Sequence, residues 1–220
     1  MNPLPIIAID GPSASGKGSI ARALAATLNF AHLETGLIYR YVGKQWLFAR
    51  KDVHDLDIAA RIAVKFAQHF SPSLLDSSLR TNPVAEAASI TSAHPPVRAA
   101  LLELQRNFAA HPPGGAKGAI LDGRDIATVI CPDAEVKLFV TATPEIRAER
   151  RRKELQSRGE NVTYEQVLNE VRVRDARDAS REIAPLTTTA GSEIIDTSNL
   201  SAEDATGVAL GIIRRILPNI

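Results

Sequence analysis

The first apolar segment of the chain is a short, uninterrupted run, and a helical periodicity follows it. Residues 5–10 read PIIAID, which is typical of a parallel strand that is covered on both faces. After a glycine-containing loop, Ile20, Leu24 and Leu28 recur every four residues among alanines. This spacing predicts a helix over residues 16–28 with one buried stripe. The chain is therefore predicted to begin with a strand, a loop and a helix.

The alternation of short apolar runs and helical patterns continues along the chain. Thr143 and Ser201 have the sequence context of N-caps, so we expect a long helix to begin just after each of them. Together these patterns predict the α/β class, with a parallel, doubly wound sheet of about five strands. We expect the further strands at residues 31–33, 119–121, 136–140 and 193–195.

Residues 36–110 interrupt this alternation. The segment is rich in helical pattern and carries only one weak strand pattern, at residues 74–81. A crossover between parallel strands needs only about a dozen residues, so this segment is too long to be a simple connection. We therefore expect an insertion at about residues 37–110 that forms its own lobe, with residues 1–36 and 111–220 as the core.

Composition narrows the class of protein further. The chain has 220 residues and a net charge of +1, which suits one globular domain and gives no overall basic field for nucleic acid or membrane. No run approaches the ~20 apolar residues that span a bilayer, and residues 1–5 carry no basic residue, so we expect no signal peptide. The single cysteine, Cys131, follows an apolar run, and we expect it to be buried rather than reactive. A chain without disulfides fits a cytoplasmic location.

The loop after the first strand is the main chemical signal. Residues 11–19 read GPSASGKGS, which matches G-x-x-x-x-G-K but has Gly18 where Ser or Thr usually follows the lysine. Backbone N–H groups of such a loop suit phosphate oxygens, and Lys17 can bridge the β- and γ-phosphates. A glycine turn can also join a strand to a helix without any ligand. We expect a nucleoside triphosphate site made by Gly11, Pro12, Ser13, Ala14, Ser15, Gly16, Lys17, Gly18 and Ser19.

The order G-K-G-S resembles the loop of nucleoside monophosphate kinases. In that variant the hydroxyl comes one position late, and we expect Ser19 to face Mg²⁺ from the first turn of the helix. The base-reading element N-K-x-D of GTPases is absent from the sequence. A kinase is therefore the favoured class.

Arginines at the ends of predicted strands indicate an anionic second substrate. Arg124 and Asp125 lie in LDGRD, at the carboxyl end of a predicted strand, where open α/β sheets bind ligands. Arg40 ends the stretch ETGLIYR, just after another predicted strand. Guanidinium groups form paired hydrogen bonds with phosphate, although either arginine could form a surface salt bridge instead.

A charged segment near the end of the predicted core has a more specific pattern. Residues 145–182 hold ten basic and nine acidic side chains, so they form no polyanion-binding patch. Arg174, Arg177, Asp178 and Arg181 follow the spacing i, i+3, i+4 and i+7, which predicts one shared helical face. Such a face suits a phosphate-bearing sugar, and a solvated face of ion pairs is the alternative.

With these residues in view, the chain is similar to the bacterial cytidylate kinases, a family of nucleoside monophosphate kinases. The resemblance implies one kinase domain, residues 1–220, with a P-loop three-layer core, an inserted monophosphate-binding lobe and an arginine-bearing lid at about residues 147–181. The resemblance runs nearly end to end, with segment 70–84 as the exception. The matching stretches are residues 9–19, 34–40, 87–98, 121–140 and 174–186.

The resemblance implies ATP-dependent phosphorylation of CMP and dCMP with Mg²⁺, a step of pyrimidine nucleotide metabolism. Catalytic roles would belong to Lys17, Arg174 and Arg181. Cytosine would be recognised by Ser89, Arg98 and Asp125. The full set of residues that the resemblance assigns to CMP is Thr35, Tyr39, Arg40, Ser89, Arg98, Arg124, Asp125, Asp178 and Arg181.

The chain departs from the family pattern at two places. Residues 34–37 read ETGL where the family usually has D-[ST]-G-A, and residues 70–84 are short for the family's small β-sheet. We expect a monomer acting on small-molecule substrates, without nucleic-acid or membrane partners. The alternatives are another kinase of the same fold, an ATP-binding sensor without turnover, and a protein that presents its arginines to RNA.

Overall fold

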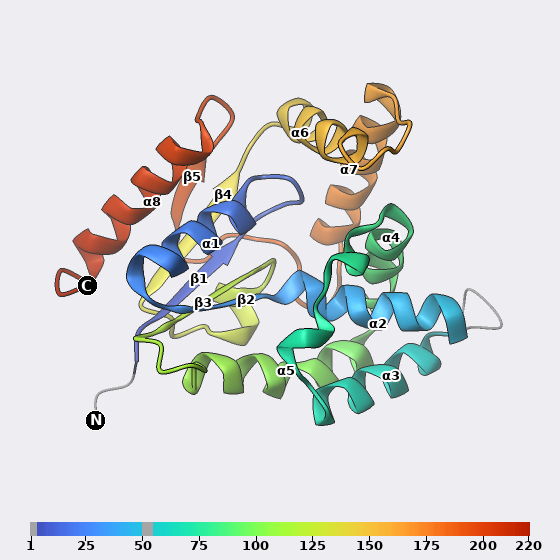
Figure 1. Ribbon diagram of the computed structural model, residues 1–220, viewed down its shortest axis with the longest axis horizontal. Helices are drawn as coiled ribbons and strands as arrows, with labels where there is room; N and C mark the ends of the chain where they lie inside the picture. Colours follow the sequence, from blue (N-terminus) through green and yellow to red (C-terminus); the bar gives the residue numbers. More distant parts are fainter. Residues whose placement is uncertain (1–3, 50–54) are drawn as a thin grey trace. The chain divides into compact units, whose positions relative to one another are not determined.

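Figure 1 shows the computed structural model, which describes residues 4–49 and 55–220. Within these residues a five-stranded parallel sheet has the strand order β2-β3-β1-β4-β5. Its central strand places Ile7 opposite Ile120 on one side and Val136 on the other. The predicted α/β class with about five parallel strands is confirmed. The strands are β1 (Ile6–Asp10), β2 (Ala31–Glu34), β3 (Ala119–Gly123), β4 (Val136–Thr141) and β5 (Glu193–Asp196).

Two helices pack side by side over the sheet, α1 (Lys17–Leu28) and α8 (Ala202–Ile216) (Figure 1). The predicted stripe Ile20, Leu24 and Leu28 is buried, and it joins the strands and α8 in one apolar core. Such close packing of apolar side chains is what fixes β1 and the start of α1 relative to each other. The loop between them is therefore mounted on a rigid base.

Contacts divide the chain into two compact units. The first contains the described residues up to Leu33 together with Pro112–Ile220. The second spans Glu34–His111, of which residues 50–54 lie outside the described part. Its helices are α2 (Thr35–Ala49), α3 (Leu56–Gln68), α4 (Asn82–Thr91) and α5 (Pro95–Ala110), with two short 3-10 helices, η1 (Pro72–Leu74) and η2 (Ser77–Arg80).

The weak strand predicted at residues 74–81 was wrong, because this segment is where the short 3-10 helices lie. The Asp76 carboxylate accepts a hydrogen bond from the Ser78 backbone N–H at 2.8 Å, so the chain turns locally instead of extending. The Leu79 side chain is buried, and its carbonyl accepts from Arg40 at 2.9 Å. Local hydrogen bonds and one apolar anchor thus replace the expected strand.

The two helices of the segment expected to form the lid are α6 (Pro144–Gln156) and α7 (Tyr164–Ala179), and an apolar cluster joins them. Thr143 caps α6 by accepting from the Ile146 N–H at 3.4 Å, and Ser201 caps α8, so both predicted N-caps are confirmed. The shared helical face predicted for residues 174–181 needs correction. Because α7 ends at Ala179, Arg181 lies beyond the helix.

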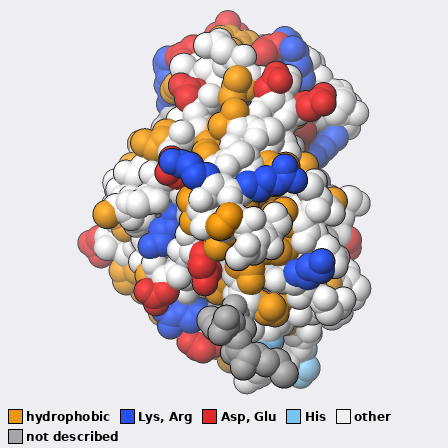
Figure 2. Space-filling model, turned by 90° about the vertical axis from the view of Figure 1, so that its left-hand side faces the viewer, with side chains coloured by type: hydrophobic (Ala, Val, Ile, Leu, Met, Phe, Trp, Pro, Cys, Tyr) orange, Lys and Arg blue, Asp and Glu red, His pale blue; other side chains and the backbone are white. Residues whose placement is uncertain are grey.

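Surface properties follow the balanced composition. Over the face shown in Figure 2, acidic and basic side chains are interspersed. Cys131 is buried, as predicted. Among the helices of the described part, none combines the length and the apolar character that crossing a membrane requires.

Candidate functional site

The loop between β1 and α1 has a backbone that only particular residues adopt easily. Gly11 and Gly16 have φ angles of 153° and 92°, and Ala14 also has a positive φ of 58°. A Cβ atom on Gly11 would lie 2.0 Å from the Val140 carbonyl oxygen, so no larger residue fits there. The loop is therefore pressed against the carboxyl end of β4. This edge of a parallel sheet is where α/β proteins bind ligands.

Two side chains of this loop are suited to phosphate. The Lys17 ammonium donates to the Pro12 carbonyl at 3.1 Å, which holds its charge over the loop. Ser15 is fully buried, and its hydroxyl has no hydrogen-bond partner among the described residues. A buried hydroxyl without a partner is costly unless a ligand oxygen completes it. The loop thus has the charge and the donor that an anion requires.

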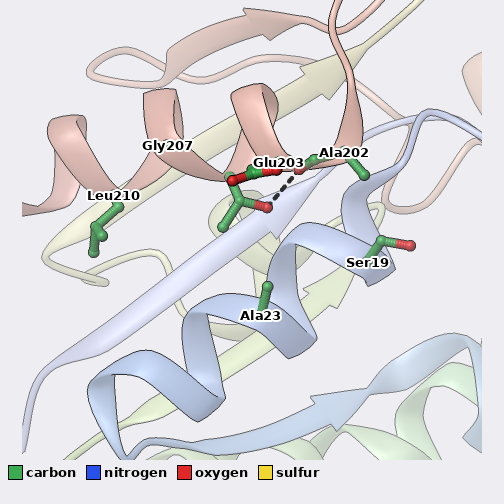
Figure 3. A pocket seen from close by; sticks show the side chains of 7 residues that line it. Ser19, Ala23, Ala202, Glu203, Gly207 and Leu210 are labelled. Carbon is green, nitrogen blue, oxygen red and sulfur yellow. Dashed lines mark hydrogen bonds between the residues drawn. The ribbon is translucent and has the colours of Figure 1, made fainter.

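Ser19 lies on the exposed side of the first turn of α1. Its hydroxyl accepts a hydrogen bond from Arg22 at 3.4 Å. It also borders a groove of about 440 Å³ between α1 and α8 (Figure 3). That groove is lined mainly by small and apolar side chains, and Ser19 is the residue of loop 11–19 that it includes. The assignment of Ser19 to Mg²⁺ remains a prediction.

Asp122 is a candidate residue that the sequence analysis missed. It ends the apolar run of β3 beside β1, where Ile9 is its register partner, and it is 3% exposed. Its Oδ1 lies 4.0 Å from where a Cβ atom on Gly18 would be, and His32 Nε2 lies 2.7 Å from its Oδ2. In P-loop proteins an Asp at such a strand end helps to hold Mg²⁺. The sequence pattern that could have identified Asp122 is AILD, an apolar run that ends in a carboxylate residue.

The donor set suits Mg²⁺ rather than a metal enclosed by protein ligands. No group of three or more His, Cys, Asp or Glu side chains in the described residues could hold a metal alone. Mg²⁺ usually keeps several waters and binds through one or two carboxylates and phosphate oxygens of a substrate. Asp122 and Ser19, next to the phosphate-binding loop, fit that requirement.

Asp178 gathers three arginines in the first unit. Its carboxylate accepts from Arg124 Nε at 2.5 Å and from Arg181, and Arg174 Nε lies 4.0 Å away. Burial disfavours the charged carboxylate, but the arginines outweigh it and lower the pKa of Asp178 to about 2. Burial likewise disfavours the charge on Arg124, whereas Asp178 raises the pKa of Arg124. The cluster is therefore fully ionised at neutral pH.

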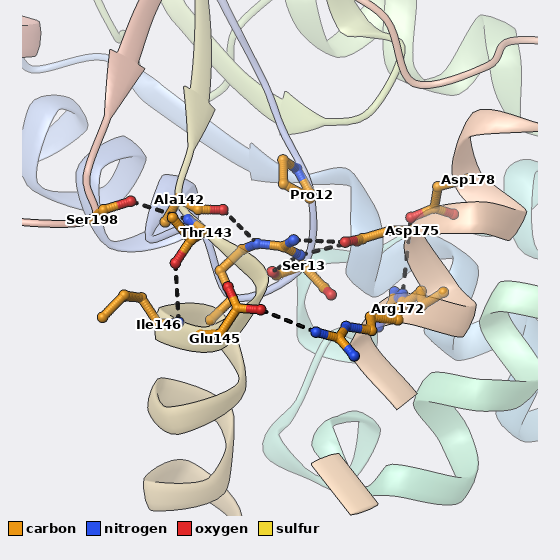
Figure 4. A network of polar contacts seen from close by, with 12 residues as sticks. Pro12, Ser13, Ala142, Thr143, Glu145, Ile146, Arg172, Asp175, Asp178 and Ser198 are labelled. Carbon is orange, nitrogen blue, oxygen red and sulfur yellow. Dashed lines mark hydrogen bonds and ion pairs between the residues drawn. The ribbon is translucent and has the colours of Figure 1, made fainter. Parts of the chain in front are cut away.

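Arg147 is a second residue that the sequence analysis missed. Its side chain is only 4% exposed, and it donates two hydrogen bonds to Asp175 of α7, at 2.9 and 2.6 Å. It also donates to the carbonyls of Ala142, at 2.8 Å, and of Ser13 in the loop, at 3.4 Å (Figure 4). One guanidinium thus connects the phosphate-binding loop, the end of β4 and α7. No local sequence pattern distinguishes it from the neighbouring arginines.

Asp125 follows β3 and precedes a short π-helical segment, η3 (Ile126–Ile130). It is 4% exposed, and its carbonyl accepts from the backbone N–H groups of Val129 and Ile130. The two following N–H groups, of Ile126 and Ala127, both bond to the Asp10 carboxylate at 2.8 Å. The candidate base-recognising residue is therefore part of a tightly hydrogen-bonded backbone segment.

The second unit brings its own predicted residues together. The Arg98 guanidinium lies 5.4 Å from the centre of the Tyr39 ring, within the range of a cation–π interaction. Arg98 also donates to the Ser92 carbonyl at 3.2 Å, and Ser92 donates to the Ser89 carbonyl at 3.3 Å. Thr35, at the start of α2, is 3% exposed. A cation, an aromatic ring and two serines thus form one local cluster.

Glu34 explains one departure from the family pattern. Its two carboxylate oxygens accept from both terminal nitrogens of Arg80, at 3.0 and 2.5 Å. Such a paired contact is stronger and more specific in geometry than a single hydrogen bond. Glu34, which stands where the family usually has Asp, therefore forms an ion pair with Arg80 within the second unit.

Comparisons with known proteins give a consistent result. A family model described as cytidylate kinase matches residues 7–215. A cytidylate kinase of Rhodospirillum rubrum is 52% identical over 209 residues, covering 94% of this chain and 96% of the relative. One of Paramagnetospirillum magneticum is 54% identical over 209 residues, with coverages of 94% and 97%. An uncharacterized protein from Eubacterium ventriosum has a TM-score of 0.53 at 15% identity, covering 95% of this chain and 98% of that chain, which concerns the fold alone.

Proposed function

The chain belongs to the cytidylate kinase family, and from this premise we propose that it transfers the γ-phosphoryl group of ATP to CMP and dCMP. The proposal rests chiefly on the geometry of the phosphate-binding loop, residues 11–19. Its backbone is forced close to β4 at Gly11, and Lys17 lies across it. The Ser15 hydroxyl is buried and has no hydrogen-bond partner within residues 4–49 and 55–220. ATP would occupy this loop, with Lys17 between its β- and γ-phosphates.

The transfer itself requires positioning and charge neutralisation. A CMP phosphate oxygen attacks the γ-phosphorus in line, a new P–O bond forms, and the bond to the β-phosphate oxygen of ADP breaks. The nucleophile is already anionic, so no strong general base is needed. Lys17, Arg174 and Arg181 would neutralise the charge of the transferring group.

Asp178 supports this role of the arginines by orienting them. Arg124 and Arg181 both donate to its buried carboxylate, so their planes are fixed before any substrate binds. Prealigned donors avoid the cost of reorganisation during the reaction. We further propose that Asp178 contacts the ribose, and that Arg124 and Arg181 contact the monophosphate together with Arg40.

Mg²⁺ would be held by Asp122 and Ser19, with phosphate and water oxygens as its other ligands. When bound, the ion neutralises phosphate charge. Removing Mg²⁺ with EDTA should therefore abolish turnover, and restoring it should recover turnover.

Base recognition in this proposal uses Ser89, Arg98 and Asp125, the residues that the family resemblance assigns to cytosine. Cytosine has an N4 amino donor with N3 and O2 acceptors, whereas uracil has an O4 acceptor and an N3–H donor. Asp125 and Ser89 can accept from N4, and Arg98 can donate to N3 and O2. Uracil would mispair with buried polar groups, so CMP should be preferred over UMP by about 30- to 1000-fold.

A coupled assay that follows ADP release over a panel of monophosphates tests the proposal. CMP and dCMP should be phosphorylated, with UMP and AMP far slower. Turnover with AMP and not with CMP would indicate another kinase of the same fold, and ATP binding without any turnover would indicate a sensor. We also propose a monomer in the cytoplasm, which light scattering and cell fractionation would check.

A further inference from the structure

Asp10 is a buried carboxylate that the mechanism above does not use. It ends β1, immediately before the phosphate-binding loop, and it is 2% exposed. Its Oδ1 accepts from the Ile126 backbone N–H and its Oδ2 from the Ala127 N–H, both at 2.8 Å. These are the first two residues of η3, directly after Asp125.

The arrangement reverses the usual way in which a helix start is capped. A residue such as Asp at the N-cap position normally accepts from its own helix. Here Asp125 is the N-cap residue, yet its side chain makes no capping hydrogen bond. Asp10, 116 residues before Ile126 in the sequence, performs that task from the neighbouring strand. The Asp125 side chain is thereby left out of the capping.

Holding a carboxylate in this position opposes its ionisation. Burial raises the pKa of Asp10 to about 6, against the lowering effect of the two N–H groups. The charged groups that act on it are Asp125, which raises this pKa further, and Lys17, which lowers it. A serine or asparagine could accept from a helix start without a buried charge. Only a carboxylate, however, offers two acceptor oxygens and no donor to two adjacent N–H groups.

We propose that Asp10 is a positioning residue for the second substrate. By accepting hydrogen bonds from the Ile126 and Ala127 N–H groups, Asp10 holds the backbone so that the Asp125 carboxylate can accept from the N4 amino group of cytosine. The inference rests on the proposed function and adds a residue to it. The competing explanation is that Asp10 acts on the adjacent phosphate-binding loop through Lys17. The two explanations differ in which substrate is affected.

The first test is Asp10→Asn, with kcat/KM for CMP and UMP and the KM for ATP. An amide keeps one acceptor but presents its NH₂ to the other N–H, so the η3 start should shift. The ratio of kcat/KM for CMP over UMP should fall about tenfold, chiefly through the KM for CMP, while the KM for ATP changes by less than about twofold. An unchanged ratio, or a change confined to ATP, would overturn the proposal.

Asp55→Ala, which removes a capping hydrogen bond elsewhere in the protein, provides the control. Asp55 also accepts from a backbone N–H at a helix start, that of Ile58 at 3.3 Å, but it caps α3 in the second unit. The CMP/UMP ratio should stay at the wild-type value. A ratio lowered as much as by Asp10→Asn would mean that capping alone, wherever it occurs, causes the loss, and would overturn the proposal.

A double-mutant cycle tests whether Asp10 acts through Asp125. In an Asp125→Asn background, Asp10→Asn should lower the CMP/UMP ratio no further, because the residue that it positions no longer recognises N4. A second, independent tenfold loss would overturn the inference. Absence of CMP phosphorylation by the wild type would refute the proposed function instead, so the two failures are distinguishable.

If Asp10→Asn does not fold, the proposal can still be tested on the wild-type protein. The CMP/UMP ratio is measured from about pH 7.5 to about pH 5.5, where phosphate ionisation affects both substrates alike and cancels. Uptake of a proton by Asp10 removes one acceptor, so the ratio should decrease towards pH 5.5. A flat ratio over this range would contradict the proposal.

Discussion

Asp10 and Asp178 are both buried carboxylates of the first unit, and both bond to the segment of residues 124–127. Asp10 bonds to the backbone after Asp125, and Asp178 bonds to the side chain of Arg124. Their pKa values nevertheless move in opposite directions, to about 6 for Asp10 and to about 2 for Asp178. The difference shows that two N–H dipoles do not offset the burial of a charge, whereas three guanidinium groups do.

The contrast also separates two tasks in one site. The backbone that carries Asp125 is fixed by a group that is costly to ionise, which suits positioning. The arginines are organised around a group that stays charged, which suits binding of an anionic substrate. The predictions below either substitute one of these two carboxylates or measure how its ionisation changes stability with pH.

Asp178→Asn should have the largest effect. It leaves the partly buried Arg124 and Arg181 without the buried carboxylate that they pair with, so the free energy of unfolding should fall by about 3 kcal/mol. Misplaced arginines should lower kcat/KM for CMP on the order of a hundredfold. Urea unfolding and steady-state kinetics measure the two effects.

Glu149→Gln is the control for that substitution, because Glu149 pairs with Arg152 on the half-exposed face of α6. It should change stability by less than about 1 kcal/mol and leave kcat/KM unchanged. Equal losses in the two variants would show that burial of the Asp178 cluster is not what matters.

Asp10 should make the protein less stable as the pH rises. Its folded pKa of about 6 lies above the ordinary value of 3.8, so the native state binds this proton more tightly than the unfolded state. The resulting cost of about 3 kcal/mol is fully present above about pH 6 and is relieved as the pH falls towards 4. Relative to Asp10→Asn, the wild type should therefore gain about this much stability between pH 7 and pH 4. A constant difference between the two proteins would contradict the raised pKa.

Asp178 should give a smaller pH effect of opposite sign. Its folded pKa of about 2 lies below the ordinary 3.8, so its stabilisation is present above about pH 4 and is lost as the pH falls through 2. Relative to Asp178→Asn, the wild type should lose about 2 kcal/mol between pH 5 and pH 2. A stability difference that stays constant below pH 4 would argue against the arginine cluster.

Sequence patterns predicted the parts of this site that are local in the chain. The strand, loop and helix at residues 5–28 follow from apolar periodicity and from glycines in special backbone conformations, and Thr143 caps its helix through neighbouring atoms. The segment at residues 74–81 was misread because Asp76 bonds to its own backbone. An apolar pattern typical of a strand does not reveal that a nearby side chain can hydrogen-bond to the backbone and turn it.

The missed residues depend on contacts between distant parts of the chain. Asp122 becomes a candidate only when β3 is known to lie beside β1, which brings it close to Gly18. Arg147 differs from the neighbouring arginines only in pairing with Asp175 and the Ser13 carbonyl. Asp10 likewise acquires its role from residues more than a hundred positions away. No periodicity encodes these pairings.

The central claim is that this phosphate-binding loop transfers a phosphoryl group from ATP to CMP, and Lys17→Met tests it most directly. The measurement is the rate of CDP formation from ATP and CMP by the wild type and by the variant, with circular dichroism to verify folding. The wild type should form CDP, and the variant should be slower by several orders of magnitude, because the transferring group loses a prealigned charge contact. A folded variant that forms CDP at close to the wild-type rate would contradict the account.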